Sequence, residues 1–253
     1  MIPTVLSIAG LDPSGGAGLT ADIKTATVMK VYAMSVITAV TVQHPGAVLR
    51  IEPIAAGLVQ QQIETLLQTM PVHAVKIGML GSANIAHAVH AALQSIDAPI
   101  ILDTIHRSTS GQILNPFRDE GWSKLYKLAS LVTPNDDEIG PLLEDYSPQD
   151  WVNLFKTSLL HTGVDDGTGF VKDTLWMPHA DQQIWRHPKI ETLHTHGTGC
   201  TLSTAIAAGM AKGLPLSKAI DDAIRLTEQL IVSASAGGLV HRNGPLLHFR
   251  FSE

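Results

Sequence analysis

Residues 5–18 read VLSIAGLDPSGGAG, and this stretch decides the fold class. Its first five residues form a mostly apolar run of the length of a buried strand, and four glycines fall within the next nine residues. After the glycines, Leu19, Ile23 and Ala26 recur at the spacing of one helix face. The order strand, glycine-rich turn, helix predicts the first half of a βαβ unit.

The same alternation continues along the chain. Residues 35–42 and 74–77 have the composition of strands, and residues 59–70 and 85–96 carry apolar side chains at helical spacing. A further apolar run, residues 99–102, ends at an aspartate. Because strands alternate with helices, we expect an α/β fold with a mainly parallel sheet and helices on both faces.

Three candidate site residues follow these strands directly. Gly10, Gly78 and Asp103 each come after a strand-like run. In α/β folds, ligands bind beyond the carboxyl ends of the parallel strands. We therefore expect all three residues at the edge of the sheet where a ligand binds.

The last third of the chain also has a clear pattern. Residues 170–176 and 183–186 predict a β-hairpin, and two helices are expected, one from Cys200 to about Lys212 and one over residues 217–233. No stretch rich in proline, serine or charge marks a domain boundary. The sequence therefore predicts a single domain, residues 1–253.

The composition argues against several classes of protein. The formal net charge is −6 and the Lys and Arg residues are scattered, which argues against a nucleic-acid partner. A single cysteine cannot form an internal disulfide, and the first residues lack the basic and apolar regions of a signal peptide. No apolar stretch reaches the roughly 20 residues that span a bilayer. We expect a cytoplasmic protein without a membrane partner.

A second glycine-rich segment, residues 195–201 with the sequence THGTGCT, precedes the first of these two helices. The N–H groups of Gly197, Thr198 and Gly199 at a helix N-terminus would form a partly positive site for a phosphoryl group in transfer. We expect the thiol of Cys200 to have a lowered pKa there and to serve as base or nucleophile. The alternative is a buried cysteine that packs like a small hydrophobe.

Oxygen-bearing side chains crowd residues 133–138, which read TPNDDE. Asn135 and Glu138 are three residues apart, so both can point the same way from a first helical turn. Such a pair suits Mg²⁺, which keeps several waters and uses few protein ligands. The alternative is an asparagine N-cap followed by acidic first-turn residues.

Three single residues have both a functional and an ordinary interpretation. Asp22 either lies near a metal or faces solvent on its helix. Gln43, at the end of a strand, either reads the donor and acceptor edge of a heterocycle or is an ordinary loop glutamine. Met79 either stacks on a flat ligand or packs in the core.

Together, these segments resemble the hydroxymethylpyrimidine and phosphomethylpyrimidine kinases of thiamine biosynthesis, members of the ribokinase-like superfamily. The resemblance covers nearly the whole chain, and several motifs in one order are far more specific than any one alone. The motifs are residues 9–18 (AGLDPSGGAG), 21–24 (ADIK), 32–39 (YAMSVITA) with Gln43, 76–79 (KIGM), 133–135 (TPN) with Glu138, 195–203 (THGTGCTLS) and 244–245 (GP).

The resemblance implies an activity and a fold. Phosphate would pass from ATP to the hydroxymethyl group of 4-amino-5-hydroxymethyl-2-methylpyrimidine, and then to that monophosphate to give the diphosphate. The fold would be a ribokinase-like three-layer α/β/α sandwich, a homodimer that uses Mg²⁺. Its partners would be the small pyrimidine substrate and ATP.

The resemblance also assigns a role to each candidate residue. The pyrimidine would be bound by Gly10, Asp12, Gln43 and Met79. The nucleotide phosphates would lie by Asp22, Asp103, Thr133, Asn135 and His161. Mg²⁺ would be organised indirectly by Asn135 and Glu138. The anion hole would be formed by Gly197, Thr198 and Gly199.

Cys200 would take the place of the aspartate base found in sugar kinases of the same superfamily. An alcohol near neutral pH needs help to lose its proton, so we expect the first phosphorylation to depend on this base. The monophosphate is already anionic, so the second step should not.

The chain departs from the family pattern at three places. Leu11 replaces a usual serine, and Thr104-Ile105 replace Pro-Val after Asp103. His161 stands where a lysine usually helps to hold nucleotide phosphates, so phosphate attraction at neutral pH should be weaker unless protonated His161 or Lys172 compensates. Two alternatives stay open: a pyridoxal kinase of the same superfamily, and a non-catalytic heterocycle-binding paralogue.

Overall fold

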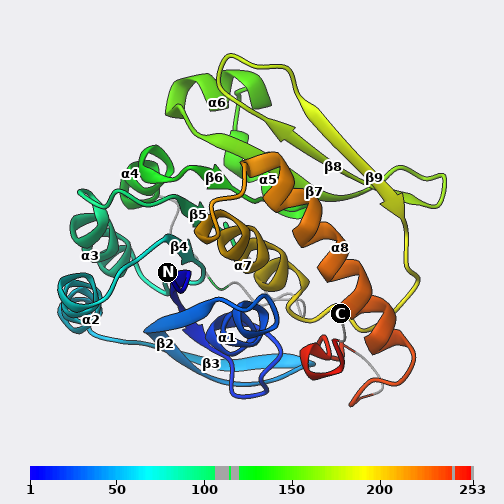
Figure 1. Cartoon of the computed structure of the whole chain (residues 1–253), viewed down its shortest axis with the longest axis horizontal. Helices are drawn as coiled ribbons and strands as arrows, with labels where there is room; N and C mark the ends of the chain where they lie inside the picture. The colour runs from blue at the N-terminus through cyan, green and yellow to red at the C-terminus, as the bar shows by residue number, and fades with distance from the viewer. Residues whose placement is uncertain (106–113, 115–119, 241–242, 252–253) are drawn as a thin grey trace.

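A nine-stranded sheet forms the centre of the computed structural model, which describes residues 1–105, 114, 120–240 and 243–251 (Figure 1). Its strand order is β3-β2-β1-β4-β5-β6-β7-β8-β9. All neighbours from β2 to β7 pair in parallel, while β3, β8 and β9 run antiparallel to their neighbours. The strands are β1 Thr4–Leu11, β2 Tyr32–His44, β3 Ala47–Pro53, β4 Ala74–Ile77, β5 Ile100–Leu102, β6 Leu131–Val132, β7 Ser158–Asp165, β8 Phe170–Trp176 and β9 Gln183–Pro188.

Helices cover both faces of this sheet. The helices α1, α7 and α8 pack on one face, with α7 between the other two (Figure 1), and α2 to α6 contribute to the core on the other face. The helices are α1 Gly18–Val28, α2 Ala56–Thr69, α3 Ala83–Leu93, α4 Glu120–Leu128, α5 Asp136–Leu143, α6 Pro148–Phe155, α7 Thr198–Ala211 and α8 Leu216–Ser235, with a short 3₁₀ turn at His248–Arg250. The predicted three-layer α/β/α architecture is confirmed.

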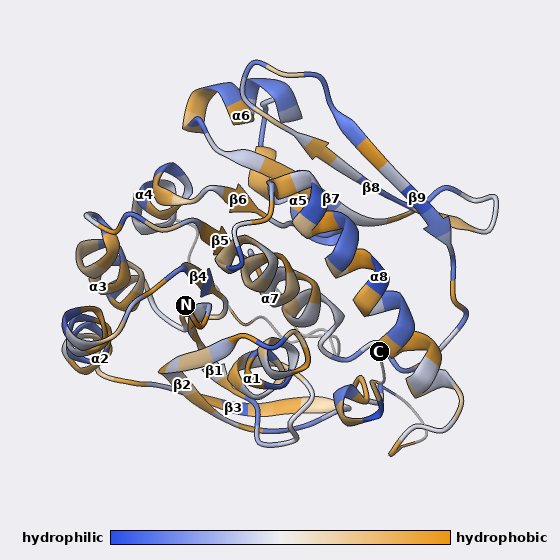
Figure 2. Cartoon of the chain, viewed as in Figure 1, coloured by the Kyte–Doolittle hydropathy of each residue, from blue (hydrophilic) through white to orange (hydrophobic). Residues whose placement is uncertain are grey.

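The central strands supply both hydrophobic cores. In β1, Val5 belongs to the core under α1, α7 and α8, whereas Leu6 and Ile8 belong to the opposite core. This division follows from the period of two residues along a strand. β5 and β6 are uniformly hydrophobic in Figure 2, because a parallel strand with helices on both faces buries every side chain.

The structure confirms the predicted elements at both ends of the chain and adds others. The predicted hairpin is β8 and β9, and the two predicted C-terminal helices are α7 and α8. β3, which forms an antiparallel hairpin with β2, was not predicted from the sequence, nor were α4, β6, α6 and β7. No helix among the described residues is long and apolar enough to cross a membrane.

Candidate active site

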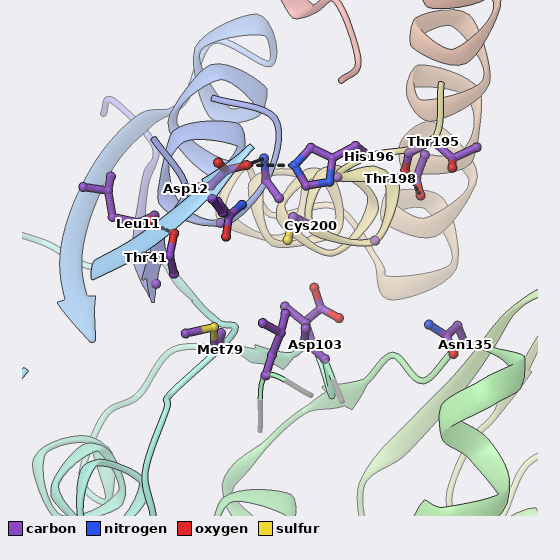
Figure 3. A pocket seen from close by; sticks show the side chains of 18 of the residues that line it. Leu11, Asp12, Thr41, Met79, Asp103, Asn135, Thr195, His196, Thr198 and Cys200 are labelled. Carbon is purple, nitrogen blue, oxygen red and sulfur yellow. Dashed lines mark hydrogen bonds and ion pairs between the residues drawn. The ribbon is translucent and has the colours of Figure 1, made fainter. Parts of the chain in front are cut away.

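A cavity of about 440 Å³ opens at the carboxyl ends of β1, β4 and β5, against the N-terminus of α7 (Figure 3). Its volume lies within the range of about 300–1,000 Å³ that is typical of small-molecule sites. Eleven of the predicted site residues line it: Gly10, Asp12, Gln43, Met79, Asp103, Asn135, Glu138, Gly197, Thr198, Gly199 and Cys200. Asp22, Thr133 and His161 are not among the lining residues.

The first glycine-rich loop is held in shape by Asp12. Its carboxylate accepts hydrogen bonds from the backbone N–H groups of Ser14 (2.8 Å), Gly16 (3.2 Å) and Ala17 (2.9 Å). Burial alone would raise the pKa of Asp12, but the hydrogen bonds from His196 and Ser14 outweigh it and hold the pKa at about 2. Asp12 is therefore an anion at neutral pH. A hydrogen bond from a substrate would have to share carboxylate oxygens that already accept hydrogen bonds from the loop.

The two glycine-rich loops interlock through His196 and Gly197. His196 Nε2 lies 2.8 Å from Asp12 Oδ2 (Figure 3). The His196 ring packs on Gly16 so closely that a Cβ there would overlap it. Gly197 has φ +86°, and a Cβ at this residue would collide with the carbonyl oxygen of Gly16. Glycine is needed at position 197 because the backbone of one loop meets the backbone of the other there, and at position 16 because the His196 ring fills the space of a side chain. His196 was not among the predicted site residues, although the glycine-rich motif contained it.

The first turn of α7 faces the cavity. Gly197 is the N-cap residue and has no side chain to cap the helix, and the space where a Cβ of Gly199 would stand is open to 4 Å. Backbone N–H groups at a helix start point outward and carry a partial positive charge. The segment therefore has the backbone arrangement of a helix N-terminus that opens onto a cavity, and the anion hole that the sequence predicts there stays a prediction.

Cys200 lies in this first turn and is 8% exposed. Burial raises the pKa of its thiol to about 12, although the nearby ammonium of Lys76 opposes the rise and a hydrogen bond from the Gly18 N–H also favours the thiolate. The expectation of a lowered pKa is wrong, because the cost of desolvating a thiolate exceeds the help that the cation and the helix terminus give.

A buried ion pair lies behind this turn. Lys76 Nζ, with no exposed side-chain surface, is 3.0 and 3.1 Å from Asp22 Oδ1 and Oδ2 and 3.8 Å from Asp103 Oδ2. Asp22 also accepts hydrogen bonds from Ser7 Oγ (2.5 Å) and Thr204 Oγ1 (2.7 Å). Asp22 is fully buried, so the alternative that it faces solvent is wrong, and its carboxylate is bonded to protein groups behind the cavity wall.

Lys76 is the functional candidate that the sequence analysis left without a role. Its signal was a lysine inside the short strand AVKI, where a charge is out of place in a central parallel strand. A charge at that position needs a buried partner, and Asp22 supplies it from α1. The sequence alone does not show which carboxylate this is.

Asp103 has both a cavity-facing position and an unusual acidity. Burial raises the pKa of Asp103 to about 7; Lys76 opposes the rise, and the charge of Glu138 adds to it. Ser203 Oγ, one turn after Cys200 in α7, donates a hydrogen bond to Asp103 Oδ2 at 3.0 Å. Asp103 is thus coupled to α7 and to the ion pair at once.

Asn135 and Glu138 form a capping box at the start of α5. Asn135 Oδ1 accepts from the Glu138 N–H (3.1 Å), and Glu138 Oε2 accepts from the Asn135 N–H (3.2 Å) and from Thr104 Oγ1 (2.6 Å). The N-cap alternative is confirmed, and both residues also line the cavity. The described residues contain no group of three His, Cys, Asp or Glu side chains placed to hold a metal ion.

The remaining predicted residues lie around or outside the cavity. Met79 is 6% exposed and packs beside Gly10, where an added Cβ would come within 3.2 Å of Met79 Cε. Thr133 Oγ1 is buried at the end of β6 with no hydrogen-bond partner in the part of the chain that the structure describes. Gln43 lies in β2 and lines the cavity, so it is not a loop residue.

His161 lies in β7 away from the cavity lining. Its Nε2 is 3.1 Å from Asp136 Oδ1, and its ring stacks on Trp176 with 6.3 Å between centroids. Burial lowers the pKa of His161; Asp136 opposes this and Lys172 adds to it. The imidazole is therefore mostly neutral at pH 7, and it does not replace a permanently charged lysine there.

Sequence comparisons give a consistent set of relatives. The profile of the family described as phosphomethylpyrimidine kinase matches residues 12–246. A hydroxymethylpyrimidine/phosphomethylpyrimidine kinase of Rhizobium meliloti is 34% identical, with 98% of each chain covered. The thiamine biosynthesis multifunctional protein ThiED of Corynebacterium efficiens is also 34% identical over 98% of this chain, which spans only 35% of that longer protein.

Solved structures show the same fold in two kinds of kinase. The ADP complex of a Bacillus subtilis pyridoxal kinase superposes with a TM-score of 0.84 at 26% identity, covering the full length of both chains. A phosphomethylpyrimidine kinase from Clostridium difficile superposes with a TM-score of 0.73 at 30% identity, covering 92% of this chain and 99% of its own.

Proposed function

Because the chain belongs to the phosphomethylpyrimidine kinase family, we propose that it transfers the γ-phosphoryl group of ATP first to 4-amino-5-hydroxymethyl-2-methylpyrimidine and then to the resulting monophosphate. One observation carries the proposal. A single cavity holds Gln43 and Met79 on one side, the anion cradle at Gly197–Gly199 on another, and Cys200 within the cradle. An acceptor hydroxyl and a phosphoryl group can therefore meet in one site.

The reaction divides naturally among these residues. Gln43 offers both a donor and an acceptor to a ring edge, and Met79 offers an apolar surface to a ring face. The cradle N–H groups would stabilise the negative charge that spreads over the equatorial oxygens of the transferring phosphoryl group. Cys200 would accept the proton of the acceptor hydroxyl as its oxygen bonds to phosphorus.

ATP is the expected phosphoryl donor, which the family implies. The similar kinases from Bacillus subtilis and Staphylococcus aureus were solved with ADP and with AMP-PCP and pyridoxal. In this chain, Asp12 links the two loops through His196 and fixes the distance between the acceptor side and the cradle. His161 does not line the cavity, so we do not assign it a phosphate contact.

The proposal includes a Mg²⁺ ion that would be held by Asn135 and Glu138 through its bound water molecules. Glu138 lines the cavity, and its Oε2 is already bonded to Thr104 Oγ1 and the Asn135 N–H, while Asn135 Oδ1 accepts from the Glu138 N–H. This set suits an ion that keeps most of its water shell and takes its direct ligands from the nucleotide. When bound, the ion would neutralise charge on the β- and γ-phosphates.

The oligomer, location and domain count are further parts of the proposal. The long hairpin of β2 and β3 exposes Val40, Val42 and Leu49, with β3 at the edge of the sheet, which is a surface suited to a second copy of the chain. We propose a cytoplasmic homodimer of a single kinase domain, supported by one continuous sheet and a lone buried cysteine. Sedimentation at micromolar concentration tests the dimer.

Pyridoxal kinase is the second candidate, because the pyridoxal kinase from Bacillus subtilis superposes over the full chain. ATP consumption with three acceptors decides the question: the free pyrimidine, its monophosphate and pyridoxal. We expect turnover with both pyrimidines and a kcat/KM for pyridoxal at least about ten-fold lower, a difference of about 1.4 kcal/mol. Binding of the pyrimidine without any ATP consumption would contradict the kinase and support the non-catalytic paralogue.

A further inference from the structure

A cluster of buried charges lies against the first turn of α7, where Cys200 stands. Among the residues that the structure describes, Lys76 in β4 is the cation of this cluster, and two carboxylates flank it, Asp22 in α1 and Asp103 after β5. Figure 3 shows Cys200 and Asp103 facing the same part of the cavity. The charge of Lys76 lowers the pKa of the Cys200 thiol and the charges of Asp103 and Asp22 raise it, while the charge of Glu138 raises the pKa of Asp103.

α7 is tied to this cluster on the side next to Cys200. Ser203 and Thr204 follow Cys200 by three and four residues, which is one helical turn. Ser203 Oγ donates to Asp103 Oδ2 (3.0 Å) and Thr204 Oγ1 donates to Asp22 Oδ1 (2.7 Å). The helix that carries the thiol is therefore fixed relative to both carboxylates and, through them, to the ammonium group.

The charge on Lys76 is permanent. Burial alone would lower the pKa of Lys76, but Asp22 together with Cys200 and Asp103 raises it above its ordinary value. The side chain has no exposed surface, so water does not screen its charge as it would at the surface. A fixed cation next to a thiol in a dry environment favours the thiolate, and each adjacent carboxylate disfavours it.

We propose that Lys76 is a positioning residue that stabilises the Cys200 thiolate electrostatically, and that Asp22 determines how much of this stabilisation reaches the sulfur. The catalytic consequence of this inference rests on the proposed function. In the first phosphorylation the Cys200 thiolate takes the hydroxyl proton, the acceptor oxygen bonds to phosphorus, and the bond from phosphorus to the ADP oxygen breaks. The neutral thiol then returns its proton to solvent before the next turnover.

The single cysteine makes this proposal directly measurable. Every molecule of iodoacetamide that alkylates a thiol of the folded chain reacts with Cys200, because the sequence contains no other cysteine. Well below the pKa, the alkylation rate is proportional to the thiolate fraction, so one unit of pKa changes the rate about ten-fold. The rate is measured at several pH values between 7 and 9, without ATP or acceptor.

Two substitutions break the same ion pair but should shift the rate in opposite directions. Lys76→Met removes the cation, and we expect alkylation to become about ten-fold slower; Asp22→Asn removes the opposing anion, and we expect it to become several-fold faster. A purely structural role for the pair would open the site in both variants and speed both reactions. Equal rates in all three proteins, or a shift of both variants in one direction, would overturn the proposal.

A double variant separates the electrostatic effect of Lys76 from the effect of an unpaired buried charge on folding. Lys76→Met alone leaves Asp22 without its cation, whereas Lys76→Met with Asp22→Asn removes both charges and keeps the shapes. We expect this variant to react more slowly than the native chain, because Lys76 is the stronger of the two influences on Cys200. Circular dichroism checks that each variant is folded.

Matched charge changes far from the site serve as controls. Lys212→Met changes an exposed lysine at the C-cap of the same helix, and Asp181→Asn changes an exposed aspartate between β8 and β9. Both should alkylate within about two-fold of the native rate. The measurement needs no turnover, so its failure would leave the proposed kinase activity standing, and an absent kinase activity would leave the alkylation result valid.

Discussion

The thiol of Cys200 is held mostly protonated by burial, although the ammonium group of Lys76 favours its thiolate. Its pKa of about 12 means that the thiolate is scarce at neutral pH but, once formed, is a strong base. A base of this kind helps only a reaction whose acceptor must lose a proton in the transition state. The two phosphorylations differ in this respect.

We therefore expect Cys200→Ser to affect the two steps unequally. Loss of a general base costs about 10²–10⁴-fold, so the first phosphorylation should slow at least about a hundred-fold. The second step, whose acceptor is already anionic, should slow less than about ten-fold. Single-turnover assays with each acceptor measure both rates on the same preparation, and an equal loss in the two steps would remove the role of base from Cys200.

Gly197 lies where the two glycine-rich loops meet. A Cβ at Gly197 meets the carbonyl oxygen of Gly16, and the residue has φ +86°. We expect Gly197→Ala to destabilise the fold by about 1–3 kcal/mol, because both the overlap and the backbone conformation oppose a side chain. Urea unfolding measures this change.

Gly57 and Gly199 are the controls for this substitution. Nothing lies within 4 Å of a Cβ at either position. Gly57→Ala, in α2, should stabilise the protein by about 0.5–1 kcal/mol, and Gly199→Ala should leave stability near native but weaken nucleotide binding. If Gly197→Ala unfolded at the same urea concentration as the native protein, the contact between the loops would not contribute to the stability of the fold.

At the scale of elements, the C-terminal 3₁₀ turn joins the two helices next to the site. His248 Nε2 lies 3.1 Å from the hydroxyl oxygens of both Thr25 in α1 and Thr201 in α7, and the ring is 3% exposed. Burial lowers the pKa of His248 to about 4, and Lys24 adds to this effect. Protonation of the His248 imidazole therefore destabilises the folded state.

This pKa gives the stability a defined pH dependence. The folded pKa lies below the unfolded value of 6.5, so the full contribution is present above 6.5 and is lost as the pH falls toward 4. The loss at low pH should reach about 3 kcal/mol, and His248→Gln should lack this part of the slope. Urea unfolding at pH 7 and 4.5 compares the two proteins, with His179→Asn at an exposed histidine as control; identical slopes in all three would contradict the assignment.

The elements that the sequence predicted are those whose pattern is local. β1 and α1 could be predicted because an apolar run of strand length is followed by a glycine-rich turn and then by apolar residues at helical spacing. α7 and α8 could also be predicted from local patterns. β6 has only two residues, too few to show a period, and β3 is an edge strand whose residues are all half-buried or exposed, without a period of two. These elements depend on neighbours that lie far away in the sequence.

The same limit applies to the site. The sequence predicted Gly10 and Asp103 at the ligand-binding edge of the sheet because each follows a strand-like run, and both line the cavity. It did not show that Lys76 pairs with Asp22, since these residues are 54 apart, nor how deeply Cys200 is buried. The sign of the Cys200 pKa shift depends on that depth, which explains why the expected direction was wrong.

At the scale of the whole molecule, the site lies where three distant parts of the chain meet on one sheet. The loop after β1 and the loop before α7 are joined by the pair Asp12–His196, which are 184 residues apart. The C-terminal segment adds a third link, because the His196 N–H donates to the carbonyl oxygen of Gly244 at 3.2 Å. The cavity therefore depends on the complete fold and not on a single motif.

The most direct test of a kinase that phosphorylates one pyrimidine twice is ³¹P NMR of a single reaction. The native protein is mixed with the free pyrimidine, Mg²⁺ and more than two equivalents of ATP. We expect a phosphomonoester signal that rises first and then gives way to the two coupled signals of a diphosphate, with two ADP formed for each pyrimidine. Unchanged ATP, or a reaction with pyridoxal but not with the pyrimidine, would contradict the account.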